Sequence, residues 1–288
     1  MGDEELLTAN GVDLCAETFG DRGDAALLLI GGAGCSMDYW DVEFCGELAA
    51  AGRRVIRYDL RDTGRSVAYP PGAPTYTSRD LVDDVIGLLD VLGVAEGHLV
   101  GMSMGGGLAQ LVALTQPARV RSLTLFSTTA IRPVDDELPP PSAALIRHLS
   151  NPPAEPDWRD ADAVTNYLVA DLRAYAGTLP VDDAAVRALV HRIVLRTRDI
   201  ESSVKNHSVL PDDQAPADLQ MSAITAPTLV MHGTADPLFP LEHGRALARA
   251  IPGARFVALE GVGHELPPRP VWPVVIGELI RHTKPAEV

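Results

Sequence analysis

Basic residues are few relative to acidic ones in this chain of 288 residues. Lys and Arg number 24 against 39 Asp and Glu, which gives a formal net charge of −15. An acidic surface repels phosphate backbones and anionic lipids. Aromatic residues make up only 5% of the chain, too few to favour a platform on which nucleic-acid bases stack. We therefore expect neither nucleic acid nor a membrane surface as a partner.

The chain also lacks long hydrophobic runs and metal-type cysteine spacings. No apolar run approaches the roughly 20 residues that span a membrane, and the first residues, MGDEELL, are acidic where a signal peptide would be basic. The three cysteines, Cys15, Cys35 and Cys45, are odd in number and show no ligand spacing, which favours reduced thiols. We expect a soluble, cytoplasmic protein without a metal or cofactor.

Strand and helix patterns alternate through most of the chain. Asn10-Gly11 predicts a tight hairpin, and Thr77 with Asp80 predicts a capping box at the start of the helix at 78–92. The alternation as a whole predicts an α/β fold with a mostly parallel central sheet and helices on both faces. Strands are expected at 4–8, 12–19, 26–30, 53–59, 97–101, 120–127, 226–233 and 254–261, and helices at 40–51, 78–92, 104–116, 241–250 and 271–282.

One segment interrupts this alternation. Residues 131–157 are rich in proline, and helices are expected at 160–176, 182–196 and 199–208. We interpret residues 131–218 as a helical cap inserted into a core formed by residues 1–130 and 219–288. Such an insertion lies over the carboxyl ends of the strands, where open α/β sheets bind ligands.

The stretch LVGMSMGGG, residues 99–107, contains Gly101-x-Ser103-x-Gly105 directly after one expected strand and directly before a helix. This is the context of a nucleophile elbow, a sharp turn that strains the serine backbone and exposes its hydroxyl. A side chain at Gly101 or Gly105 would collide with the neighbouring strand or helix. The helix N-terminus also favours negative charge beside Ser103.

A serine nucleophile needs a base, and the base needs an acid to orient it. Asp236 follows the strand expected at 226–233, and His264 follows the strand expected at 254–261. Taken singly, Asp236 could be a helix cap or an Asx turn, and His264 a surface imidazole. Their joint order and position favour a Ser-Asp-His triad.

Other candidates for these roles have weaker positions. Glu260 and Asp218 do not occupy the loop position after a strand, and we expect His232 to be packed or hydrogen-bonded within its strand. The cap histidines could touch substrate but not reach Ser103; they are His148, His191 and His207. The loop residues Asp59, Arg61 and Asp62 are expected to tie a turn beside the active site through ion pairs.

Together these motifs resemble the α/β-hydrolase superfamily over essentially the whole chain. Within it, RYDLRDTGRS and GMSMGG look most like the methylesterases that act on anthracycline-type polyketides, the aclacinomycin methylesterase group. The resemblance implies Ser103 as nucleophile, His264 as general base and then acid, and Asp236 as its orienter.

The resemblance also implies an oxyanion hole built from two backbone N–H groups. One belongs to Met104, directly after the nucleophile, and the other to Ala33, in the turn after the strand at 26–30. Many family members begin this turn with His-Gly, where this chain has Gly31-Gly32. The substitution keeps the backbone donor but removes a side chain that usually braces the turn.

The expected reaction is two-step hydrolysis of a small-molecule substrate, an apolar carboxylic ester with a bulky or polycyclic acyl group, which the resemblance narrows to a methyl ester of a polyketide-type metabolite. Carbon–carbon bond hydrolases, cofactor-free oxygenases, perhydrolases and a ligand-binding or cyclase protein that retains the triad stay open as alternatives. Gly32-x-Gly34 could also begin a dinucleotide fingerprint, but Met37 occupies the place of its third glycine.

Overall fold

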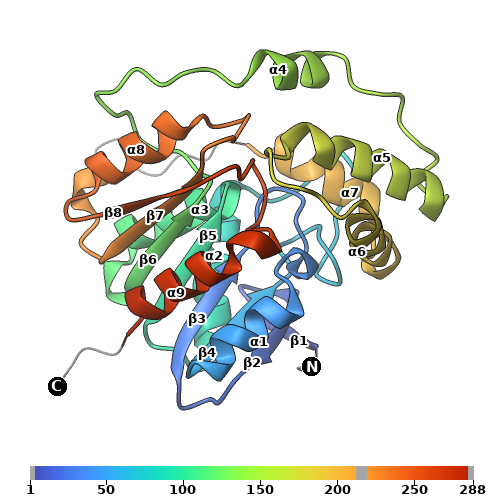
Figure 1. Ribbon diagram of the computed structural model, residues 1–288. Helices are drawn as coiled ribbons and strands as arrows, with labels where there is room; N and C mark the ends of the chain where they lie inside the picture. The colour runs from blue at the N-terminus through green and yellow to red at the C-terminus, as the bar shows by residue number, and fades with distance from the viewer. Residues whose placement is uncertain (1–3, 212–218, 285–288) are drawn as a thin grey trace.

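The computed structural model describes residues 4–211 and 219–284, and within these residues eight strands form one sheet (Figure 1). Their order across the sheet is β1-β2-β4-β3-β5-β6-β7-β8. The pairs β1–β2 and β2–β4 are antiparallel and every other pair is parallel. The strands are β1 (Glu5–Ala9), β2 (Val12–Phe19), β3 (Ala25–Ile30), β4 (Arg53–Tyr58), β5 (Gly97–Met102), β6 (Val120–Phe126), β7 (Thr228–Gly233) and β8 (Arg255–Leu259).

Helices cover both faces of the sheet, as the sequence predicts (Figure 1). Successive side chains of a strand point to opposite faces, and β3 shows this clearly. Leu27 and Leu29 pack in one apolar cluster with α1 (Val42–Ala50) and α9 (Trp272–His282). Leu28 and Ile30 pack in another cluster, on the opposite face, with α2 (Ser78–Val91), α3 (Met104–Thr115) and α8 (Leu241–Ala250).

Local sequence signals account for the element boundaries. Asn10 and Gly11 have φ of 47° and 75°, the left-handed pair that a tight hairpin between β1 and β2 requires. At the start of α2 the Asp80 carboxylate accepts the backbone N–H of Thr77 at 2.8 Å, within the predicted capping box. Both predictions are confirmed.

Further helices lie between β6 and β7, beyond the end of the sheet in Figure 1. They are α4 (Ala143–Ser150), α5 (Ala161–Tyr175), α6 (Asp183–Arg196) and α7 (Ile200–Lys205). α5, α6 and α7 share an apolar cluster of their own around Val164, Val190 and Ile193. The division into core and cap stays a prediction, and its boundary at residue 218 falls outside the described residues.

α4 is not among the helices that the sequence predicts, because it lies within the proline-rich stretch 131–157. Ser142 caps this helix by accepting the N–H of Leu145 at 3.2 Å, so eight residues without proline suffice for two turns. Among the helices of the described residues, none combines the length and the apolar character needed to cross a membrane.

Candidate active site

Ser103 occupies a strained turn between β5 and α3. Its φ of 52° and ψ of −119° fall where residues with a side chain are rare. A Cβ on Gly101 would lie 2.2 Å from the carbonyl oxygen of Gly105, and a Cβ on Gly105 would lie 2.4 Å from that of Gly31. Only glycine therefore allows α3 to approach β5 and β3 this closely. The predicted elbow geometry is present in the structure.

The structure brings Ser103, His264 and Asp236 together at the carboxyl ends of β5, β8 and β7. His264 Nε2 lies 2.9 Å from Ser103 Oγ, and His264 Nδ1 lies 2.9 Å from Asp236 Oδ2. An ionised carboxylate can only accept, so Nδ1 carries the proton and Nε2 is free to accept from the serine hydroxyl. This tautomer is the one that a general base requires.

Asp236 also stabilises the turn in which it lies. Its Oδ1 accepts the backbone N–H groups of Leu238 at 2.9 Å and Phe239 at 2.8 Å, while Oδ2 faces His264. The carboxylate is buried, with the residue only 5% exposed. The Asx turn and the contact with histidine, which were alternatives in the sequence, therefore coexist on the two oxygens of one side chain.

Two backbone segments border Ser103 where an oxyanion would form. Met104 is the first residue of α3, so its N–H has no acceptor within the helix. Across from it, a Cβ on Gly32 would lie 3.4 Å from Ser103 Cβ, which places the turn after β3 against the nucleophile. Ala33 follows Gly32 and is exposed. The assignment of Met104 and Ala33 as donors stays a prediction.

The competing residues bond other groups or lie outside the triad, although His232 Nε2 is also 3.5 Å from Asp236 Oδ2. His232 is buried and bonds the carbonyl of Phe239 through Nε2 at 2.7 Å, as expected for a histidine packed in its strand. Glu260 is exposed, and Asp218 lies outside the described residues. His207 corrects one expectation: both of its ring nitrogens bond backbone groups and the residue is 8% exposed, so it is not available to a substrate.

The loop after β4 is tied by ion pairs beside the site, as predicted. Arg61 binds Asp84 through two nitrogens at 2.7 Å each, and Asp62 accepts the hydroxyl of Tyr76 at 2.6 Å. The partner of Asp59 is Arg196, at the end of α6.

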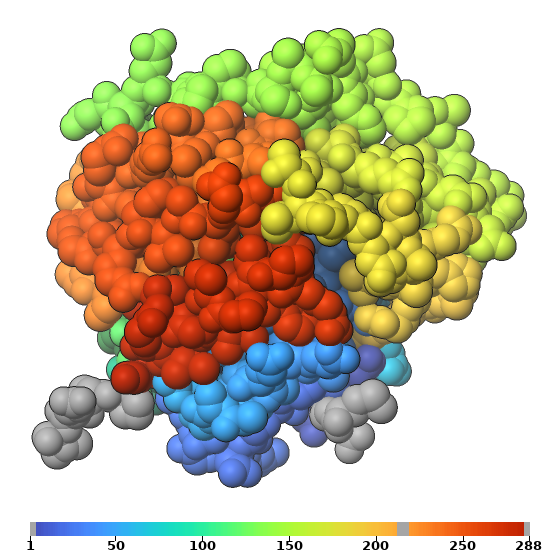
Figure 2. All heavy atoms as spheres, viewed as in Figure 1, coloured from blue at the N-terminus to red at the C-terminus, as the bar shows by residue number. Residues whose placement is uncertain are grey.

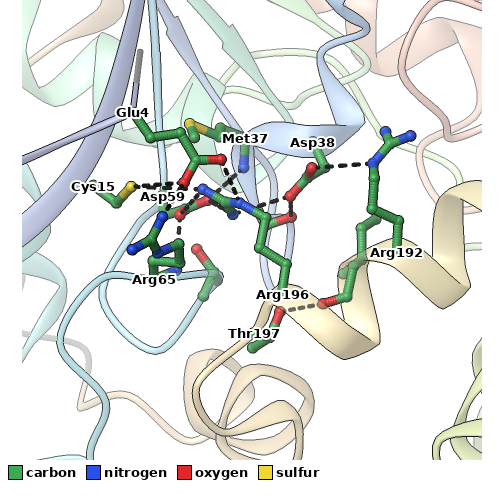
Figure 3. Close-up of polar contacts among 12 residues, drawn as sticks. Glu4, Cys15, Met37, Asp38, Asp59, Arg65, Arg192, Arg196 and Thr197 are labelled. Atoms are coloured by element: carbon green, nitrogen blue, oxygen red, sulfur yellow. Dashed lines mark hydrogen bonds and ion pairs between the residues drawn. The ribbon is translucent and has the colours of Figure 1, made fainter.

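Arg196 forms the centre of a charged cluster between α6 and the core (Figure 3). It lies 2.9 Å from Asp59, 3.0 Å from Asp38 and 2.8 Å from Glu4. The Asp59 carboxylate also accepts the N–H of Met37 at 2.8 Å, in the chain just after the Gly32 turn. Burial raises the pKa of Asp59, and the bonds to Arg196 oppose this increase. Nothing in the local sequence around Arg196 indicates this role.

The segment after α5 contacts the loop that carries His264. The His264 N–H donates to the Tyr175 carbonyl at 2.8 Å, and the Thr178 N–H donates to the Gly261 carbonyl at 2.8 Å. The ring of Tyr175 lies 6.1 Å from that of His264, and the ring of Phe239 lies 5.4 Å from it edge-on. Figure 2 shows a hollow in this face between the yellow segment after α5 and the red C-terminal part of the chain.

A model of the alpha/beta hydrolase fold family matches residues 25–267. The chain belongs to this family. The α/β-hydrolase fold predicted from the sequence is thereby confirmed, and the sheet order with its helices on both faces agrees with it. Within the described residues, no group of three His, Cys, Asp or Glu side chains could hold a metal ion.

Two relatives match this α/β-hydrolase over nearly its full length. Rhodomycin D methylesterase DauP of Streptomyces sp. (strain C5) is 33% identical, with 98% of this chain and 99% of the relative covered. Rhodomycin D methylesterase DnrP of Streptomyces peucetius is 32% identical with the same coverage. A crystal structure of a hydrolase from Pseudomonas aeruginosa PA01 superposes with a TM-score of 0.72 at 25% identity, covering 99% of each chain. The methylesterases confirm the predicted enzyme class, a carboxylic ester hydrolase.

Proposed function

We propose that the protein hydrolyses a carboxylic ester through a Ser103–His264–Asp236 triad. One observation carries this proposal: a continuous hydrogen-bonded chain runs from Ser103 Oγ through both ring nitrogens of His264 to Asp236 Oδ2, with 2.9 Å at each step. The backbone strain at Ser103 supports it, because strain of this kind is typically kept at functional sites.

The geometry defines the role of each group. Ser103 Oγ attacks the ester carbonyl carbon while its proton passes to His264 Nε2. The Met104 and Ala33 amides donate to the oxyanion, and one such donor contributes about 3 kcal/mol to transition-state stabilisation. The tetrahedral adduct collapses as His264 returns the proton to the leaving alcohol. Water then attacks the acyl-enzyme with His264 again as base, which releases the acid and restores Ser103.

The substrate class that we propose is a methyl ester of a polycyclic, polyketide-type metabolite. The names of the two methylesterase relatives support a methyl ester on such a compound. The rings of Tyr175 and Phe239 near His264 supply apolar, aromatic surface suited to a flat polycyclic acyl group. We also propose that α4 to α7 act as the cap that excludes water from this group.

A substrate panel tests the proposal. Wild type and Ser103→Ala are compared on an anthracycline-type methyl ester, on p-nitrophenyl esters and on a vinylogous 1,5-diketone cleaved by carbon–carbon hydrolases. We expect hydrolysis of esters by wild type alone, with methanol released from the methyl ester in amounts equal to the acid. Cleavage of the diketone without ester hydrolysis would instead assign the triad to carbon–carbon bond hydrolysis.

A further inference from the structure

The turn after β3 has to be held in place for its amide to reach the oxyanion of a Ser103 adduct. Gly32 lies close to Ser103, since a Cβ placed on it would be 3.4 Å from Ser103 Cβ. The Cys35 N–H donates to the Gly32 carbonyl at 3.1 Å, which closes a tight turn over residues 32–35. Within this turn Gly34 has a φ of 70°, in the left-handed region that favours glycine. The glycine pair at 31–32 offers no side chain to brace this turn, so its support must come from elsewhere.

Both backbone groups of Gly34 bond to side chains of the segment after α6. The Gly34 N–H donates to His207 Nδ1 at 2.9 Å, and the Gly34 carbonyl accepts the Ser203 hydroxyl at 3.1 Å. Ser203 lies on α7, and His207 lies on the short 3-10 helix that follows, Asn206–Ser208. The turn that borders Ser103 is therefore held from the cap, more than 160 residues further along the chain.

The second ring nitrogen of His207 fixes its state. Nε2 lies 2.9 Å from the Arg61 carbonyl oxygen. Because the Gly34 N–H can only donate and the Arg61 carbonyl can only accept, the imidazole must be neutral with its proton on Nε2. Burial lowers the pKa of His207 to about 4, which agrees with a neutral ring near pH 7. A proton on Nδ1 would break the bond to Gly34.

The 3-10 helix that carries His207 is itself anchored to the core. The Asn206 amide donates to Asp62 at 2.9 Å and accepts the Gly72 N–H at 2.6 Å. Asn206 is fully buried. His207 thus bonds to two loops, one after β3 and one after β4, from a helix that Asn206 anchors to the core. The imidazole therefore holds the 32–35 turn in a fixed position.

We propose that His207 is a positioning residue of the reaction: it bridges the Gly34 N–H to the Arg61 carbonyl and so aims the oxyanion amide of the 32–35 turn at the Ser103 adduct. This proposal rests on the proposed esterase function. It gives the cap a part in transition-state stabilisation, since removing the bridge lets the turn relax away from Ser103 without changing the nucleophile or its base.

The test compares His207→Leu with His207→Gln, because a glutamine amide keeps one acceptor and one donor for Gly34 and Arg61. His282→Gln, a change at a partly exposed histidine at the end of α9, is the control. Each variant is assayed on a p-nitrophenyl ester and with a trifluoromethyl ketone, whose serine adduct carries an oxyanion. For His207→Leu we expect kcat to fall 10- to 100-fold with KM within about twofold, and Ki for the ketone to rise by the same factor as kcat/KM falls. His207→Gln should recover at least part of this loss, and His282→Gln should match wild type.

The outcomes separate this proposal from the one on which it rests. If a fluorophosphonate labels Ser103 fully and His207→Leu keeps wild-type kcat and Ki, the positioning role is wrong while the triad stands. If wild type is neither labelled nor active, both proposals fall. Should His207→Leu not fold, ¹⁵N NMR of the wild-type imidazoles decides: a neutral Nε2–H form of His207 at pH 7 is expected, and an Nδ1–H or charged form overturns the bridge.

Discussion

His264 Nε2 lies 2.9 Å from Ser103 Oγ although 161 positions separate the two residues in the chain. Ser103 follows β5 and His264 follows β8, and the intervening parallel pairs β5–β6, β6–β7 and β7–β8 align the carboxyl ends of these strands along one edge of the sheet. The sheet thus brings Ser103 and His264 close together, and the loops that carry them orient their side chains. Substitutions in these loops should therefore distinguish effects on catalysis from effects on folding.

Asp236→Asn should abolish most activity and leave the fold intact. The amide oxygen can keep the bonds to Leu238 and Phe239, but its NH₂ group would face His264 Nδ1 and force the proton onto Nε2. A ring in that tautomer cannot accept the Ser103 proton, so we expect kcat to fall by about 10⁴-fold. Asp236→Ala should lower both kcat and the melting temperature, since it also removes the two turn bonds. An active Asp236→Asn enzyme would contradict the orienting role.

Gly105→Ala should destabilise the elbow. The new Cβ would meet the carbonyl oxygens of Gly31 and Ile30 at 2.4 and 2.5 Å, so either α3 or the turn after β3 must move. We expect a loss of about 1–3 kcal/mol in the free energy of unfolding together with lower kcat. The matched control is Gly107→Ala on the same helix, where the nearest atom would be Ile131 Cγ2 at 3.4 Å. Urea unfolding should show this control to be as stable as wild type or slightly more stable.

Arg196→Met should loosen the contact between α6 and the core. Asp59 is fully buried and would lose its guanidinium partner, which typically costs about 3 kcal/mol in the free energy of unfolding. Arg192→Met is the control, because Arg192 is 58% exposed and its pairing with Asp38 at 3.4 Å should contribute at most about 1 kcal/mol. Equal stability losses for the two variants in chemical denaturation would show that the Arg196 cluster does not hold α6.

Stability should decrease as the pH falls from about 6.5 to about 4. Burial lowers the pKa of both His98 and His207 to about 4 in the folded protein, from an ordinary value of 6.5. Between these values both histidines bind more protons in the unfolded chain than in the folded one, so their contribution to the free energy of unfolding decreases as the pH falls. Each histidine should account for about 2 kcal/mol between pH 8 and pH 5. Denaturation curves of His98→Gln and His207→Gln should each show a shallower pH dependence than wild type.

The regular part of the fold could be predicted from sequence because each of its elements carries its own local signal. The Asn10-Gly11 turn, the Thr77–Asp80 capping box and the Gly101-x-Ser103-x-Gly105 elbow depend on residues a few positions apart. Strand order then brought Asp236 and His264 to the edge where Ser103 lies.

The contacts that the helices between β6 and β7 make with the rest of the chain could not be predicted in the same way. His207 is 173 positions from Gly34, and Arg196 is 137 positions from Asp59. These contacts depend on how the helices between β6 and β7 pack against the rest of the chain, which no local pattern encodes. For the same reason the prediction for His207 was wrong. Its position in the sequence made it a candidate for substrate contact, but both of its ring nitrogens bond to backbone groups.

Reaction of Ser103 with a fluorophosphonate tests most directly whether Ser103 is the nucleophile. The folded protein is treated with a molar excess of the probe, and the adduct is quantified by intact mass and located by peptide mapping. The triad geometry predicts one adduct per chain on Ser103, loss of esterase activity in proportion to labelling, and no adduct on Ser103→Ala. A folded wild-type protein that resists the probe, or an adduct on another residue, would contradict the role of Ser103 as nucleophile.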